Sequence, residues 1–146
     1  MRDTISDMQV KRCISPISVA DTTAQVGQII DRQGYQGLGY VITIGSVADA
    51  DATFVVLLEE GDDSGLSDAA AVADIDMISQ TSGAAPEASA SFAFDSDNQV
   101  RKLGYIGSKR YTRLTITPAA NSSAAVFSAV ALLEYPSREP VTQGTA

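Results

Sequence analysis

The side chains best suited to chemistry lie in one short acidic segment, residues 58–68, with the sequence LEEGDDSGLSD. Its carboxylates belong to Glu59, Glu60, Asp62, Asp63 and Asp68. Two carboxylates can share acid and base roles in hydrolysis, and several together can bind a divalent cation. The spacing departs from a calcium-binding loop, in which ligands alternate and glycine holds the sixth position. Gly and Asp are also typical of a solvated loop between strands, and the pattern favours this interpretation.

The side chains that the chain lacks restrict the chemistry further. There is no His and no Trp, and Cys13 is the single cysteine. Without His, the commonest general base and the commonest transition-metal ligand are both absent. A lone cysteine cannot form an internal disulfide, and the apolar run after Cys13 predicts a small side chain that is buried or half-buried. We therefore expect a protein that is not an enzyme and that carries neither a cofactor nor a metal.

Length and hydropathy predict one globular domain with polar ends. The chain has 146 residues, of which 45% are hydrophobic, enough for a single packed core. It has no apolar run of about 18 residues, and its first residues lack the apolar segment of a secretory signal. We expect synthesis in the cytoplasm and no membrane partner. A β-sandwich domain over residues 8–136 is predicted between an N-terminal arm, 1–7, and a C-terminal arm, 137–146.

The elements that position these side chains are predicted to be strands. Apolar and polar residues alternate, with β-branched and aromatic enrichment, in segments 8–14, 40–47, 52–60, 98–107, 109–118 and 123–136. Residues 69–81 favour a strand over a helix, and residues 81–94 indicate a loop that leads into a short strand at Phe92 and Phe94. About eight short strands and no clear helix predict an all-β protein, an antiparallel sandwich or barrel.

Short connections in this pattern predict β-hairpins. Residues 48–51 join two strong strand signals, Gly107-Ser108 fits a tight two-residue turn, and residues 109–136 have the pattern of a final hairpin. Both faces of segment 123–136 are partly apolar, which is typical of a strand in the middle of a sheet or at a subunit contact. The N-terminal strand carries Arg12 on its apolar face and is expected at a sheet edge.

Charge is distributed unevenly along the chain. No Lys or Arg lies between Arg32 and Arg101, although the net charge is −8. Half of the ten basic residues fall in the predicted hairpin: Arg101, Lys102, Lys109, Arg110 and Arg113. They could form a solvated strand face, pair with an acidic patch on a partner or neighbouring copy, or bind nucleic acid with Tyr105 and Tyr111 as stacking rings. The net negative charge disfavours direct nucleic-acid binding.

Three segments together resemble a known family of virion proteins. They are TTAQVGQIIDRQGYQGLGYVITIG, TFVVLLEEGDDSGLSDAAAV and VRKLGYIGSKRYTRLTITPAANSSAAVFSAVALLEYP. The resemblance is to head decoration, or cement, proteins of tailed bacteriophages, which have a jelly-roll β-sandwich. It covers most of residues 8–136 and depends on the strand layout and on GYIGSKRYTRLTIT. It implies a structural protein on the outside of the capsid that bridges and stabilises neighbouring major capsid proteins.

The resemblance implies partners but no catalytic residues. The expected partners are the major capsid protein and copies of the chain itself, as a dimer or trimer, and the expected location is the capsid exterior. Candidate polar contacts are Arg101, Lys102, Lys109, Arg110 and Arg113, and candidate apolar contacts are Tyr105, Tyr111, Phe127 and Tyr135, each of which could also belong to the core. The alternative function is a carbohydrate- or receptor-binding jelly-roll module of a phage tail or fibre.

Overall fold

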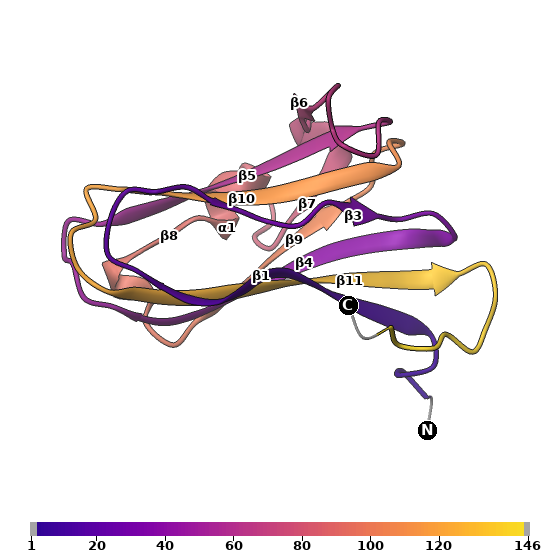
Figure 1. The fold of residues 1–146 in the computed structure, drawn as a ribbon, viewed down its shortest axis with the longest axis horizontal. Coiled ribbons are helices and arrows are strands. Elements are labelled where there is room, and N and C mark those ends of the chain that lie inside the picture. The colour runs from indigo at the N-terminus through magenta and orange to yellow at the C-terminus, as the bar shows by residue number, and fades with distance from the viewer. Residues whose placement is uncertain (1–2, 145–146) are drawn as a thin grey trace.

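The computed structural model describes residues 3–144 as two antiparallel sheets packed face to face (Figure 1). The first sheet contains, in spatial order, β1 (Met8–Val19), β11 (Ala125–Pro136), β4 (Tyr35–Val47), β9 (Val100–Tyr105) and β7 (Met77–Ser79). The second contains β2 (Gln25–Val26), β10 (Tyr111–Ala119), β5 (Thr53–Gly61) and β6 (Ala70–Ala71), with β3 (Ile30–Asp31) also paired to β10 and β8 (Phe92–Ala93) to β5.

From β4 to β11 the long strands alternate between the two sheets, and the short strands β2 and β3 come between β1 and β4, which is the strand order of a jelly roll. β1, β4, β9 and β11 lie in the first sheet, while β5 and β10 lie in the second, where β2 and β3 act as one interrupted strand beside β10. The prediction of an all-β, antiparallel, jelly-roll-like sandwich is confirmed. Residues 3–144 form eleven strands rather than about eight, because short pieces of strand flank β10 and β5.

The predicted hairpins are wrong, because each of them joins strands of different sheets. β4 and β5 flank residues 48–51, β9 and β10 flank Gly107-Ser108, and β10 and β11 make up the final segment, yet no two of these consecutive strands pair. β10 pairs with β5, and β11 pairs with β1 and β4. Turn residues determine where the chain reverses, but a short connection can either close a hairpin or cross the sandwich.

The core consists of the inward-facing residues of both sheets, as period-two alternation requires. On β11 the buried set is Ala125, Phe127, Ala129, Ala131 and Leu133. The rings of Phe54, Phe92 and Phe127 pack together with centroids 4.7 to 5.7 Å apart. The hydroxyl groups of Tyr40 on β4 and Thr112 on β10 are 2.6 Å apart and link the two sheets in the interior.

β1 is an edge strand, as predicted, and it is interrupted by bulges. The pairing with β11 shifts register between Arg12 and Ile14, so Cys13 and Ile14 are both buried although they are adjacent. Burial raises the pKa of the Cys13 thiol to about 12, which keeps it protonated and unreactive at neutral pH. The prediction of a buried cysteine is therefore confirmed.

The region between β5 and β9 differs most from the sequence prediction. Residues 69–81, expected as one strand, contain β6, the 3₁₀ turn η1 (Asp74–Asp76) and β7. The expected loop contains the helix α1 (Pro86–Ala90), and the strand expected to include Phe94 ends before the 3₁₀ turn η2 (Phe94–Ser96). Pro86 begins α1 at a position where its missing N–H costs nothing. Pro86 and Ala90 are buried against the sandwich, and Glu87 accepts the backbone N–H of Leu58 on β5.

The residues that follow β11 lie beside β1. The backbone N–H of Val141 donates to the carbonyl of Ser6, and the Gln143 amide makes two hydrogen bonds with the backbone of Val10. Residues 1–2 and 145–146 of the predicted arms lie outside the described residues. Between residues 3 and 144, no helix has the length and hydropathy needed to cross a membrane.

Candidate functional site

The predicted basic contact residues do not form one patch. Arg101 and Lys102 lie on β9 in the first sheet, whereas Arg113 lies on β10 in the second and Lys109 and Arg110 directly precede β10. The latter three pair with carboxylates of the same chain. The pairs are Lys109–Asp62, Arg110–Asp31 and Arg113–Glu59, with N–O distances of 2.6, 2.8 and 2.8 Å. The positive charge expected on one hairpin is thus largely balanced within the chain.

The predicted apolar contact residues divide between core and surface. Tyr105 and Phe127 are buried in the core and are not available at the surface of the chain. Tyr105 donates its hydroxyl hydrogen to Glu60 and accepts from the backbone N–H of Lys109. Tyr111 is half-buried below the guanidinium of Arg110, whose central carbon lies 4.9 Å from the ring centre, and Tyr135 is exposed.

The acidic segment is a self-contained loop. Asp68 accepts the backbone N–H groups of Asp62 and Asp63, and Asp63 accepts those of Gly65 and Ser67. These hydrogen bonds lower the pKa of both Asp63 and Asp68. Within residues 3–144, no three Asp, Glu or Cys side chains are grouped closely enough to hold a metal ion. The geometry matches the solvated loop that the sequence favours.

An apolar groove on the outer face of the first sheet has a floor that consists of two glycines. The β-sheet registers align one outward-facing residue from each strand of the first sheet: Val10, Leu132, Gly39, Gly104 and Ile78. Gly39 and Gly104 lie opposite one another and carry no side chain. The outer surface of the sheet therefore has a depression between the side chains of Leu132 and Ile78. The groove has a volume of about 270 Å³.

The walls of this groove are mostly apolar. Leu132 and Val41 line one side, Ile78 and Gln80 line the other, and Lys102 places one positive charge beside it. A Cβ at Gly39 would approach nothing closer than the Leu103 carbonyl oxygen at 3.9 Å, so the space above this residue is open. Such a groove can hold an aliphatic side chain of another molecule.

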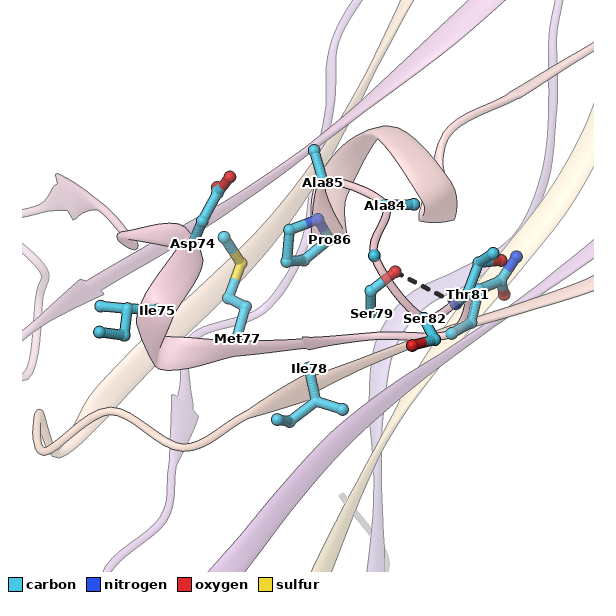
Figure 2. A pocket seen from close by; sticks show the side chains of 12 residues that line it. Asp74, Ile75, Met77, Ile78, Ser79, Thr81, Ser82, Ala84, Ala85 and Pro86 are labelled. Atoms are coloured by element: carbon cyan, nitrogen blue, oxygen red, sulfur yellow. Dashed lines mark hydrogen bonds between the residues drawn. The ribbon is translucent and has the colours of Figure 1, made fainter.

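A second concave surface lies along the free edge of β7 and has a volume of about 830 Å³. Figure 2 shows how the chain surrounds it: η1 precedes β7, and the loop after Ser79 returns past Ala84 and Ala85 to Pro86 at the start of α1. Met77 points toward Pro86, whereas Ile78 points to the opposite side of the strand (Figure 2). Ile78 is about half exposed (52%) and separates this edge concavity from the glycine groove.

The backbone of β7 presents unused hydrogen-bonding groups at this edge. The N–H of Ile106 donates to the Asp76 carbonyl at 2.8 Å, which fixes the phase of the antiparallel ladder between β7 and β9. In that phase the N–H and C=O groups of Ile78 face β9, and those of Met77 and Ser79 face away. The Met77 N–H donates to the Asp74 carbonyl, but within residues 3–144 the Met77 C=O and both backbone groups of Ser79 have no partner.

Sequence reasoning missed this surface because it depends on strand order. Gly39 looks like a turn residue in the sequence, although its spacing of two from Gly37 within a strand pattern is a signal that both share one face. Gly104 meets Gly39 only because β9 pairs with β4. Nothing in the sequence of β7 indicates that it is an edge strand of the sheet.

Comparisons with known proteins assign the chain to no family. No protein-family model matches it, and no curated protein sequence matches it. Among solved structures, it is similar to a family two carbohydrate esterase from Cellvibrio japonicus, with 12% sequence identity and a TM-score of 0.35. The alignment covers 92% of this chain but only 36% of the esterase chain. A likeness at this level carries no argument about function.

Proposed function

We propose that this chain is a structural virion protein that binds the outer surface of a bacteriophage capsid and bridges neighbouring major capsid proteins. The observation that supports this most directly is the surface around β7, where a glycine-floored apolar groove adjoins a free strand edge. The resemblance to decoration proteins supplies the capsid as partner. The net charge of −8 favours a protein that stays soluble before assembly.

The arrangement of the carboxylates favours binding over catalysis. Glu59 is held by Arg113, Glu60 by Tyr105 and Asp62 by Lys109, so each serves the fold. A carbohydrate-binding module is the second candidate, and such modules stack sugars on exposed aromatic rings. The walls of the glycine groove are mostly aliphatic, with Gln80 and Lys102 beside them, and Tyr40, the one aromatic residue that lines it, is fully buried. This surface therefore suits a protein partner better than a sugar.

Co-sedimentation with capsids that lack this protein tests the proposal. The purified chain should bind such heads saturably, at a fixed ratio to the major capsid protein, and the decorated heads should survive heat or low salt better than bare heads. Absence of binding by a folded sample would reject the capsid role. Binding to a glycan array or to host cells, without binding to heads, would favour the receptor-binding alternative.

A further inference from the structure

We infer that the β7 edge accepts an extended, positively charged segment of a partner protein as an added β-strand. This inference names the kind of partner segment and the part of the surface that it uses, and its capsid test rests on the proposed function. The three unpartnered backbone groups at Met77 and Ser79 are those that an incoming strand requires, since strand addition gains its affinity from main-chain hydrogen bonds.

The two edge strands of the first sheet differ in how far other segments of the chain cover them. At the other edge, β1 is covered: the Gln143 amide binds the N–H and C=O of Val10, and the Gln28 N–H donates to the Cys13 carbonyl. Free edges are a liability, and proteins protect them with charges, prolines or covering segments. β7 consists of Met77, Ile78 and Ser79, which include neither a charge nor a proline. The unprotected edge is therefore suited to a partner.

The surroundings of β7 select the charge of that partner. The chain from residue 33 to residue 100 contains no Lys or Arg, so η1, β7, α1 and the loop between β7 and α1 carry no positive side chain. Asp74 is exposed and lines the concave surface, and the half-buried Asp76 lies in the same turn. The whole molecule, at −8, adds a long-range attraction for positive segments. Lys102 lines the glycine groove on the other side of Ile78, so the selection for positive charge applies at the β7 edge itself, where a nucleic acid or an acidic peptide would be repelled.

The apolar residues around the edge indicate what else the segment carries. Ile75 is 83% exposed, Ile106 is 60% exposed, and Ile78 lies between the two concave surfaces. An extended segment places alternate side chains on opposite faces, so one set can cover Ile78 while the other enters the concavity beside Ala85 and Pro86. The fitting chemistry is a segment of alternating aliphatic and basic residues.

Ser79→Pro tests the added strand with little effect on the fold. Proline removes the Ser79 N–H, which points away from β9, and the preceding Ile78 is already in a strand, as a residue before proline prefers. Ser79→Ala is the matched control, because it loses the same side-chain hydrogen bonds to Ser89 and Thr81 but keeps the backbone donor. Circular dichroism and thermal melting establish that both variants fold. Asp74→Lys is a second variant that changes charge and leaves the edge intact.

Two probes separate this inference from the capsid role. The first is a soluble peptide of alternating Val and Lys, with a Val and Glu peptide as control, titrated into the isotope-labelled protein. The Val and Lys peptide should shift the Ser79 and Ile78 amide resonances of the wild type. It should bind Ser79→Pro and Asp74→Lys about tenfold more weakly, the size of one lost hydrogen bond or charge contact. Unshifted amides at β7, or equal binding of both peptides, would overturn the inference.

The second probe is the capsid lacking this protein. If wild-type protein and Ser79→Ala bind heads and Ser79→Pro binds about tenfold less, the capsid protein supplies the added strand. If all three bind equally, the inference is wrong and the capsid role stands. If wild-type protein fails to bind heads, the capsid role is wrong, and the peptide titration alone decides whether β7 accepts a strand.

Discussion

At the scale of single residues, glycine contributes to the candidate site by having no side chain. Gly39→Val should place a side chain in the groove on the outer face of the first sheet, and the new Cβ itself meets no clash, because only the Leu103 carbonyl oxygen lies within 4 Å of it. Valine also suits a strand better than glycine does. We expect an equal or higher melting temperature and about tenfold weaker binding to heads, as for a lost buried apolar contact.

The control for this prediction is a second position on the same outward face of β4. Thr43 is exposed on β4, outside the residues that line the groove, so Thr43→Val changes the same face by a similar side chain. Calorimetry and co-sedimentation measure both variants. Gly39→Val that binds heads as tightly as Thr43→Val would show that the groove takes no part in the contact.

The buried hydroxyl pair of Tyr40 and Thr112 permits a second prediction. Tyr40→Phe or Thr112→Val alone leaves one buried hydroxyl without its partner, which should cost about 1–3 kcal/mol of unfolding free energy. The double variant removes both polar groups and should lose clearly less than the sum of the two single losses. Urea unfolding of the four proteins measures the coupling, and additive losses would mean that the hydrogen bond does not join the sheets as described.

At the scale of elements, the sequence predicted strands much better than it predicted their partners. The alternation of residue types identified the buried face of β10, with Thr112, Leu114 and Ile116, because this alternation is visible within the sequence of the strand itself. Pairing is not recorded locally: β1 meets β11, more than one hundred residues away, and this fixes the whole order of the first sheet. The candidate site depends on that order, so Ile78 and Gly104 could not be identified from sequence alone.

The segment after β11 supports a prediction about the β1 edge. Gln143 accepts from the Val10 N–H at 3.0 Å and donates to its carbonyl at 2.6 Å, so one side-chain amide replaces a neighbouring strand. Gln143→Ala removes both bonds and should speed hydrogen exchange of the Val10 amide. Thr142→Ala, in the same segment, should not. Amide exchange followed by NMR measures the difference, and equal rates in the two variants would contradict the covering role.

At the scale of the whole molecule, the jelly roll separates three surfaces with different tasks. Ion pairs gather at the beginning of β10, the C-terminal segment covers β1, and the far edge of the same sheet is left open at β7. Because β1 and β7 terminate opposite sides of one sheet, a partner strand at β7 and the covering segment at β1 do not compete. The fold can therefore take a partner on one side without opening the other.

Several carboxylates stabilise the fold although the net charge is negative, and lowering the pH should remove their contribution to the unfolding free energy. Hydrogen bonds lower the pKa of Asp49, Asp63 and Asp68 below the ordinary 3.8, as does Arg110 for Asp31. Their contribution is present above pH 3.8 and is lost as the pH falls through the lower folded-state values, since the unfolded chain then binds more protons. Burial raises the pKa of Glu87 above 4.5, so the ionised form of Glu87 opposes folding. The unfolding free energy therefore increases as the pH falls toward 4.5 and Glu87 is protonated.

The unfolding free energy should therefore rise slightly from pH 7 to about pH 4.5 and then fall steeply below about pH 4. Glu87→Gln retains an oxygen that can accept the Leu58 N–H and should abolish the rise while leaving the fall. Asp31→Asn loses the charge that faces Arg110 and should make the fall shallower. Urea unfolding at pH 7, 4.5 and 3 measures each curve. A wild-type curve as high at pH 3 as at pH 4.5 would mean that these carboxylates do not stabilise the fold.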